Sequence, residues 1–376
     1  MQLCRFLFMN TSSQEKTTKA FFQLLRIAIG NENAFSYYLN DDEWNWIWDM
    51  AHRQALTGVV FDGICLLPQK QRPPQAIILK GVAAIQNIEQ ANRLLNRYSV
   101  LVSQKFQKEG FRSAILKGQG NALWYPNPMH RMPGDIDIWL EGGREKIMAY
   151  VRHYFLKASA RYHHVDFPII KGIDIEVHFT PTWMSAYPDN RFLQKWFAEE
   201  QEAQFANTVT LPENTGTIPV PTPAFNRIFL LIHIYRHFFD EGIGLRQLLD
   251  YAMLLNQGTT EKEKAESVRI LKRMHLLRFT SALMHILQNV FGIEGKHLLT
   301  APSEKEGDFI LQEIMQNGNF GQHNRNINRQ NGKSASYFTS KFLYKTRFLT
   351  RYPRETIWGH VFWIGQRIWR WHKRYV

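Results

Sequence analysis

Hydrophobic side chains follow two different spacings along the chain, which divide it into helical and mixed stretches. Over residues 17–110 they recur every three or four positions, as in amphipathic helices, and Pro73 and Pro74 stand where a long helix would begin. Over 111–221 short runs alternate apolar and polar residues, as strands do: RSAIL, GDIDIWL, YHHVDF and IDIEVHF. Beyond Thr222 the helical spacing returns. The pattern predicts an α+β fold with a small mixed β-sheet flanked by N-terminal and C-terminal helical domains.

Five segments follow from this pattern. We expect a helical region over 1–110, a sheet-containing core over 111–221, and a second helical domain over 222–316. We expect a linker rich in Asn, Gly, Gln and Ser over 317–336 and a basic, aromatic, helical tail over 337–376. Within the second helical domain the spacing predicts helices at 223–239, 244–256, 262–276 and 279–291.

Length and composition fit a folded protein of more than one domain. A chain of 376 residues exceeds what one compact core usually supports, and 44% hydrophobic residues exclude extensive disorder. The two cysteines are too few for a disulfide framework, which favours a reducing, cytoplasmic compartment. No signal-peptide pattern opens the chain, and no apolar run is long enough to predict a transmembrane helix.

The positive charge is concentrated at the C-terminal end. Residues 333–376 hold ten Lys or Arg and a single acid, Glu355, and so carry +9 of the formal net charge of +13. Arg and Lys alternate there with Trp, Tyr and Phe, which suits an anionic partner such as a nucleic acid or a membrane surface. The alternative is a helix that packs an apolar face onto the preceding helices and leaves its arginines in solvent. That face would carry Ile357, Val361, Ile364 and Ile368.

The sheet segment carries a constellation of acids. In GDIDIWL the period of two puts Asp135 and Asp137 on one face of a strand, where two carboxylates repel each other unless a cation lies between them. In IDIEVHF the same period aligns Asp174, Glu176 and His178. If the two strands are neighbours, three carboxylates meet, as in phosphoryl-transfer sites with two Mg²⁺ or Mn²⁺ ions. Ordinary alternation on a surface strand explains the spacing equally well.

The sequence AILKGQGNALWYPNPMHRMPGDIDIWL resembles a largely uncharacterised bacterial nucleotidyltransferase family within the polymerase β superfamily. In that superfamily a strand enters a glycine-containing turn and a helix, the next strand carries the paired acids, and a later strand brings a third. The resemblance implies that Asp135, Asp137 and Glu176 are the catalytic metal ligands, with Asp174 as the alternative third acid. It places the nucleotide loop on residues 117–119.

Within that loop, Lys117 and Gly118 would offer a cation and free backbone N–H groups to a triphosphate. Gln119 departs from the family pattern, because the superfamily usually has Ser there and a shorter interval to the acids. Arg131 is a second phosphate ligand or an exposed loop arginine. We therefore expect nucleotide binding by Lys117, Gly118, Gln119 and Arg131.

Other polar residues near these motifs receive structural interpretations. Arg246 and Asp250 have the spacing of a pair on a helix surface, and a role in substrate binding is the alternative. His233 and His237 lack the glutamate of a metalloprotease motif, so we interpret them as packing or polar-network residues. His163, His164 and Asp166 lie on a predicted strand beside the acids, where a structural role is commoner than a metal role.

The function predicted is metal-dependent transfer of a nucleoside monophosphate from an NTP, with ATP as the first candidate, to an acceptor, with release of pyrophosphate. Glu176 is the candidate for taking the acceptor's proton. The acceptor stays open among small molecules, proteins and RNA. Two alternatives compete: a metal-dependent glycosyltransferase that uses a sugar nucleotide, and a catalytically silent protein that binds nucleic acid or a membrane surface.

Overall fold

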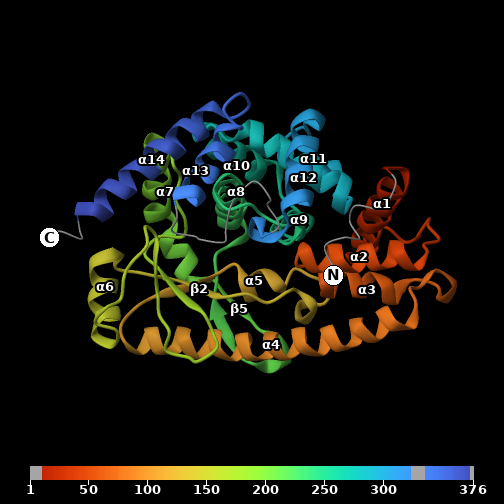
Figure 1. The fold of residues 1–376 in the computed structure, drawn as a ribbon. Coiled ribbons are helices and arrows are strands. Elements are labelled where there is room, and N and C mark those ends of the chain that lie inside the picture. The colour runs from red at the N-terminus through yellow and green to blue at the C-terminus, as the bar shows by residue number, and fades with distance from the viewer. Residues whose placement is uncertain (1–10, 323–334, 373–376) are drawn as a thin grey trace.

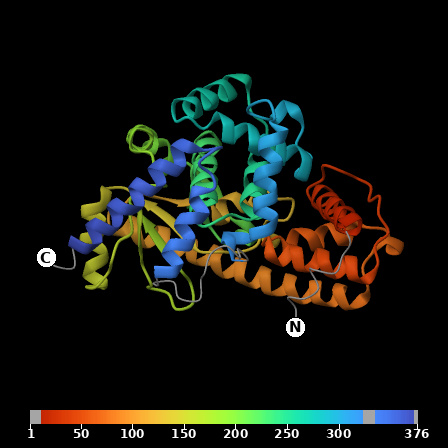
Figure 2. The same cartoon turned by 45° about the horizontal axis from the view of Figure 1, so that its top comes forward.

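A long helix supports both the sheet and the N-terminal helices. The computed structural model describes residues 11–322 and 335–372. Its first helices are α1 (Thr11–Ala28), α2 (Asp41–Arg53) and α3 (Thr57–Leu66), and they are followed by the 34-residue α4 (Gln75–Lys108). Figures 1 and 2 show α1 to α3 at one end of α4 and the sheet at the other.

Local sequence explains where these helices begin. Asn40 caps α2 by accepting a hydrogen bond from the Glu43 N–H, and the Glu43 carboxylate accepts one from the Asn40 N–H in return. Helix α4 starts directly after Pro74, as the pair of prolines predicts. The boundary is sharp because proline fixes φ and lacks an N–H group, which suits the first turn of a helix.

All four predicted runs form strands of one mixed sheet. The strands are β1 (Ser113–Leu116), β2 (Ile136–Leu140), β3 (His164–Asp166) and β4 (Ile175–His178), and their order is β1-β2-β4-β3. Strand β2 pairs antiparallel with β1 and parallel with β4, and β3 pairs antiparallel with β4. The short helix α5 (Gly118–Ala122) follows β1, and α6 (Gly143–Tyr154) follows β2.

A second helical layer covers the sheet on the side opposite α4 (Figure 1). After α7 (Tyr187–Ala206) and a hairpin of β5 (Thr208–Thr210) and β6 (Thr217–Pro219), the chain is helical. The observed helices agree with the four predicted for this part. They are α8 (Pro223–Asp240), α9 (Leu245–Asn256), α10 (Glu261–Arg273) and α11 (Leu277–Phe291), and α12 (Glu304–Asn317) follows them.

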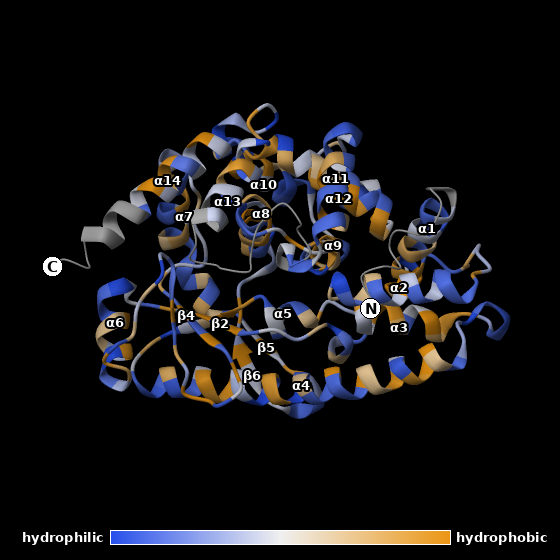
Figure 3. Cartoon of the chain, viewed as in Figure 1, coloured by the Kyte–Doolittle hydropathy of each residue, from blue (hydrophilic) through white to orange (hydrophobic). Residues whose placement is uncertain are grey.

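Two hydrophobic cores hold these layers together. One joins the N-terminal helices to α8, α9 and α11, and Figure 3 shows hydrophobic residues on these helices. The other lies between α4, the sheet and α6, and includes Phe106, Ile138 and Val177. These layers confirm the predicted α+β class. The predicted domain boundaries stay a prediction, and most of the predicted linker, 323–334, lies outside the described residues.

The C-terminal helices α13 (Ala335–Thr346) and α14 (Pro353–His372) dock on the helical layer. Phe348 is buried, and Phe362 stacks on Trp183 with ring centroids 4.2 Å apart. Five basic side chains of the tail form ion pairs with acids of the body: Lys341 and Lys345 with Asp240, Arg347 with Glu313, Arg351 with Glu306, and Arg354 with Asp189. Among the described residues, no helix is long and apolar enough to cross a membrane.

The face that we expected α14 to bury is the wrong one. Ile357, Val361 and Ile364 are each about half exposed, whereas Glu355 and Thr356 are buried. The side chain of Ile368 lies outside the described part. The helix is turned this way because its polar anchors, Glu355 and the neighbouring arginine that pairs with Asp189, find partners on the body.

Candidate active site

The register between β2 and β4 brings the predicted acids together. Asp137 lies directly opposite Glu176 on the neighbouring parallel strand, and Asp135 immediately precedes β2. Side chains that face each other across a parallel pair lie on the same face of the sheet. All three acids line a pocket of about 310 Å³ between the sheet and helices α8 and α9. Asp174 is exposed and is not among the lining residues, so Glu176 is the third acid of the pocket.

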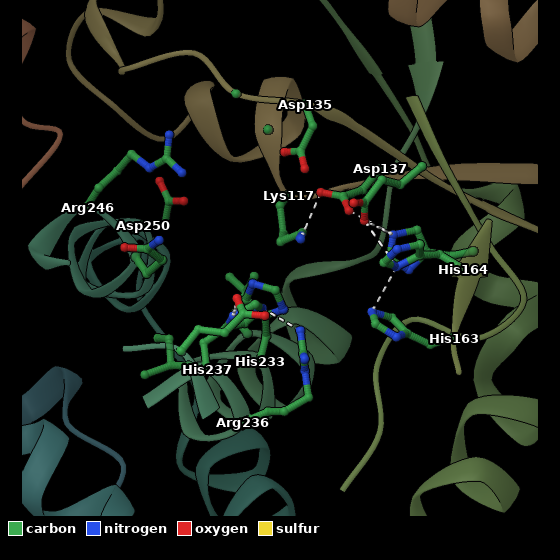
Figure 4. A pocket seen from close by; sticks show the side chains of 18 of the residues that line it. Lys117, Asp135, Asp137, His163, His164, His233, Arg236, His237, Arg246 and Asp250 are labelled. Carbon is green, nitrogen blue, oxygen red and sulfur yellow. Dashed lines mark hydrogen bonds and ion pairs between the residues drawn. The ribbon is translucent and has the colours of Figure 1, made fainter. Parts of the chain in front are cut away.

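Asp137 is buried between two cationic partners. The Lys117 ammonium lies 2.8 Å from its Oδ2, and His178 Nε2 donates a hydrogen bond of 2.7 Å to its Oδ1 (Figure 4). Burial alone would raise the pKa of Asp137, but Lys117 and His178 outweigh burial and hold that pKa well below its usual value. Asp137 is therefore a carboxylate at every physiological pH.

The pKa values of the other two acids are shifted in opposite directions. The charge of Asp137, followed by burial, raises the pKa of Asp135 to about 6. Burial also acts to raise the pKa of Glu176, but hydrogen bonding to His178 prevails and lowers it. Asp137, Glu176 and His178 each have an oxygen or nitrogen within 4.8 Å of the others, a spacing that suits a metal ion. A divalent cation would remove the repulsion that Asp135 experiences, so the acids fit a hard ion such as Mg²⁺.

The predicted nucleotide loop divides between the pocket and the layer behind it. Lys117 and Gly118 line the pocket, and both have positive φ, 53° and 44°. A lysine in this region is strained by about 1–3 kcal/mol, and its ion pair with Asp137 holds it there. Gln119 is buried, hydrogen-bonds to Asn96 of α4, and is not among the lining residues.

Arg131 connects the loop before β2 to the helical layer. Its guanidinium forms two hydrogen bonds with the Asp250 carboxylate, of 2.8 and 2.7 Å, and the Tyr125 hydroxyl donates a third. Arg131 is only 5% exposed, so the interpretation as an exposed loop arginine is wrong. The predicted surface pair between Arg246 and Asp250 is also wrong, because the buried Asp250 pairs with Arg131 and the half-buried Arg246 donates to backbone carbonyls.

The loop itself rests on the N-terminal helices. At Gly58 of α3, a Cβ atom would lie 2.1 Å from the carbonyl oxygen of His130, so only glycine permits this approach. His130 Nδ1 lies 2.6 Å from Asp62 of α3. The Asn92 amide of α4 donates to the carbonyl oxygens of Met129 and Arg131. Helices α3 and α4 thus fix the segment that leads into the acids.

Helices α8 and α9 form a cationic wall opposite the acids, which we define as His233, Arg236, His237 and Arg246 (Figure 4). Arg236 lies over the Trp183 ring at 5.6 Å, hydrogen-bonds to His237, and has no carboxylate partner among the described residues. Arg246 donates to the backbone carbonyls of Met132 and Pro133. Burial lowers the pKa of both arginines, and it lowers the pKa of His233 well below its usual value.

Apart from the alternative role of Arg246 in substrate binding, the sequence interpretation missed this wall as part of the site. On a helix buried on all sides, side chains three and four positions apart look like packing residues, whatever they face. One signal was available: the run IHIYRHFF places three basic residues among apolar and aromatic ones. Buried polar groups in such a setting require partners, and a ligand is one of the partners available.

Three histidines lie beside the acids. His163 and His164 lie at the start of β3, and His178 ends β4. Burial lowers the pKa of His163 well below its usual value and that of His164 to about 4. For His178, burial is outweighed by the hydrogen bonds to Asp137 and Glu176, which raise its pKa. The cluster therefore combines two neutral rings with one that favours the charged form.

The model of an uncharacterised nucleotidyltransferase family matches residues 40–292, which include the sheet, its acids and the cationic wall. The chain belongs to this family of nucleotidyltransferases. No curated protein matches its sequence. Among solved structures, it is similar to an antigenic nucleotidyltransferase-like protein from Paracoccidioides brasiliensis, with 14% identity over 50% of this chain and 91% of that one. The TM-score of that match is 0.30, too low to establish a common fold.

Proposed function

We propose that the protein transfers a nucleoside monophosphate from an NTP, with ATP as the first candidate donor, to an acceptor hydroxyl or phosphate. The observation that carries this proposal is the pairing of Asp137 with Glu176 on adjacent parallel strands at the edge of a pocket. Asp135, Asp137 and Glu176 would hold two Mg²⁺ or Mn²⁺ ions. When bound, such ions activate the attacking oxygen and neutralise the leaving pyrophosphate.

The remaining residues of the pocket bind and position. Lys117 and the backbone at Gly118 face the triphosphate from the sheet side, and Arg236 and Arg246 face it from the helices. Arg131 has a positioning role, because its ion pair with Asp250 fixes the loop that leads into β2. Gln119 supports the nucleotide loop from behind through Asn96. Glu176, whose lowered pKa keeps it ionised, is placed to accept the acceptor's proton.

Calorimetric titration tests the proposal without knowledge of the acceptor. Each NTP is titrated into the protein with Mg²⁺ or Mn²⁺, and then into an Asp135→Asn/Asp137→Asn variant. We expect metal-dependent binding of at least one NTP, lost in the variant. A Glu199→Gln/Glu200→Gln variant, with two exposed acids of α7 replaced, controls for the change of charge. Folded protein that binds no NTP would contradict the proposal and favour a sugar nucleotide donor or a silent binding protein.

The proposal leaves two earlier predictions in place. The acceptor stays open among small molecules, protein side chains and RNA. An anionic partner at the basic tail also stays a prediction, and the five side chains already paired with acids of the body are not its first candidates. We place the reaction in a reducing cytoplasm, because the chain has only two cysteines.

A further inference from the structure

Three buried histidines pack against one another at the outer part of the four-stranded sheet. The ring centroids of His163, His164 and His178 lie between 4.4 and 5.3 Å apart. One nitrogen from each ring lies within 4.8 Å of the corresponding nitrogens of the other two. Figure 4 shows His163 and His164 close together on the side of Asp137 that faces away from Lys117.

Hydrogen bonds within the protein satisfy only half of the ring nitrogens. His178 Nε2 donates to Asp137, and His164 Nδ1 lies 3.1 Å from Glu176 and 3.2 Å from His163 Nε2. The other nitrogen of each ring, His163 Nδ1, His164 Nε2 and His178 Nδ1, is buried with no hydrogen-bond partner in the described part of the chain. An unpaired buried polar atom is destabilising, and three adjacent ones make a poor core. One nitrogen from each of the three rings lies close enough to the others for the three to serve together as ligands of one ion.

We propose that His163, His164 and His178 bind a divalent transition metal ion of the zinc class, with Glu176 as the carboxylate ligand. Zinc prefers imidazole nitrogen and carboxylate oxygen in a four-coordinate shell, whereas Mg²⁺ prefers oxygen alone. Glu176 Oε2 lies 3.1 Å from His164 Nδ1 and 3.6 Å from His178 Nε2, so one ion can contact this oxygen and these two nitrogens. A carboxylate has two oxygens, and Glu176 therefore serves this site as well as the proposed Mg²⁺ site.

The consequence is a fixed position for Glu176. His164 lies on the edge strand β3, and His178 and Glu176 lie on its neighbour β4, so the ion joins these two strands at the point where the third acid projects. The inference does not depend on nucleotide transfer, because neither Asp135 nor an NTP takes part in it.

Cobalt is the probe for this site, because Co²⁺ occupies zinc sites and absorbs visible light when nitrogen ligands hold it in a four- or five-coordinate shell. Chelator-treated, full-length protein is titrated with Co²⁺. We expect one equivalent of Co²⁺ to give a visible band that Zn²⁺ displaces and millimolar Mg²⁺ does not. His163→Ala and His164→Ala should each weaken binding by more than about 100-fold, because loss of an outer-shell partner alone costs 10–100-fold.

Two further variants separate this inference from the proposed function. His285→Ala removes a buried histidine outside the pocket, which contacts Asp308 at 3.0 Å, and should leave the cobalt band unchanged. Asp135→Asn should keep the band and lose metal-dependent NTP binding. A band that survives in His163→Ala, or that disappears in Asp135→Asn, would overturn the inference.

X-ray absorption of the zinc-loaded wild type provides a measurement that does not depend on how any variant folds. We expect three imidazole ligands. A protein that takes up no zinc, or whose zinc has fewer than three imidazole ligands, would also overturn the inference.

Discussion

The acids on the sheet and the cations on the facing helices reach one pocket by different routes. Asp135 and Asp137 are placed by the period of two within a single strand, and Glu176 joins them through one parallel register. Arg236 and Arg246 come from two helices about a hundred residues further along the chain. The position of the acids follows from short-range sequence spacing, whereas the position of the arginines depends on how the helical layer packs on the sheet. Substitutions of the acids should therefore weaken metal binding most. Substitutions on the facing helices should change both the affinity for the nucleotide and the stability of the fold.

The largest effect is expected at the third acid. Glu176→Gln should weaken metal-dependent NTP binding by about 1000-fold, because a bound ion contributes several kcal/mol to such sites. Asp174→Asn, two residues earlier on the same face of the strand but exposed outside the pocket, should leave the affinity unchanged. Calorimetry with the NTP that binds wild type measures both. Equal losses in the two variants would mean that the pocket is not where the metal binds.

The junction between the two regions should show the largest effect on stability. Arg131→Met leaves Asp250 as a buried carboxylate without its guanidinium, and we expect the free energy of unfolding to fall by about 3–5 kcal/mol. Arg269→Met breaks an exposed ion pair with Glu266 and should change it by about 1 kcal/mol or less. Urea denaturation followed by circular dichroism compares them. A similar, small effect in both variants would show that the buried pair does not hold the loop to α9.

In the C-terminal helix α14, Glu355 has a pKa shifted in the opposite direction to that of Asp137. Burial raises the pKa of Glu355 from 4.5 to about 7, although the nearby Ser185, Lys345 and Tyr235 act to lower it, and Asp240 adds to the increase. The folded state thus holds a proton that the unfolded chain releases above pH 4.5. Stability should fall as pH rises from about 5 to 7, and the full penalty above pH 7 is up to about 3 kcal/mol.

Glu355→Gln tests this effect because its side chain is uncharged at every pH. The variant should be more stable than wild type at pH 8 and nearly equal to it at pH 4.5. Thermal unfolding at several pH values measures the difference. A gain that does not depend on pH would indicate better packing by the amide and would contradict the raised pKa.

The smallest effect is expected within the cationic wall. Arg236→Met should weaken NTP binding by about 30-fold, or 2 kcal/mol, since a buried cation facing the ligand is lost. Stability should be unchanged or higher, because the guanidinium is buried and has no acidic partner among residues 11–322 and 335–372. Arg273→Met removes an arginine that likewise lies over an aromatic ring, Phe192, but outside the pocket, and should not affect binding. If Arg236→Met unfolds the protein and Arg273→Met does not, Arg236 is structural.

The same comparison explains what the sequence could predict. The four strands, the acids and the four helices after Thr222 follow from short-range spacing, and the structure has all of them. Sequence spacing could not show that Asp250 binds Arg131 rather than Arg246. Arg131 and Asp250 lie more than a hundred residues apart in the chain and meet only when the layers pack. Nor could it show which face of α14 is buried, because that depends on partners such as Asp189 on another element.

The close approach of α3 to the loop before β2 also bears on the order of folding. Gly58, Asp62 and Asn92 precede the loop in the chain, so the surface that receives His130 leaves the ribosome before the loop does. The acids of β2 and Arg131, which pairs with Asp250 of α9, can then pack on helices that have already formed. Gly58→Ala would place a methyl group against the His130 carbonyl and so hinder packing of the loop on α3. The acids and Arg131, which follow His130 in the chain, would then be misplaced in the pocket.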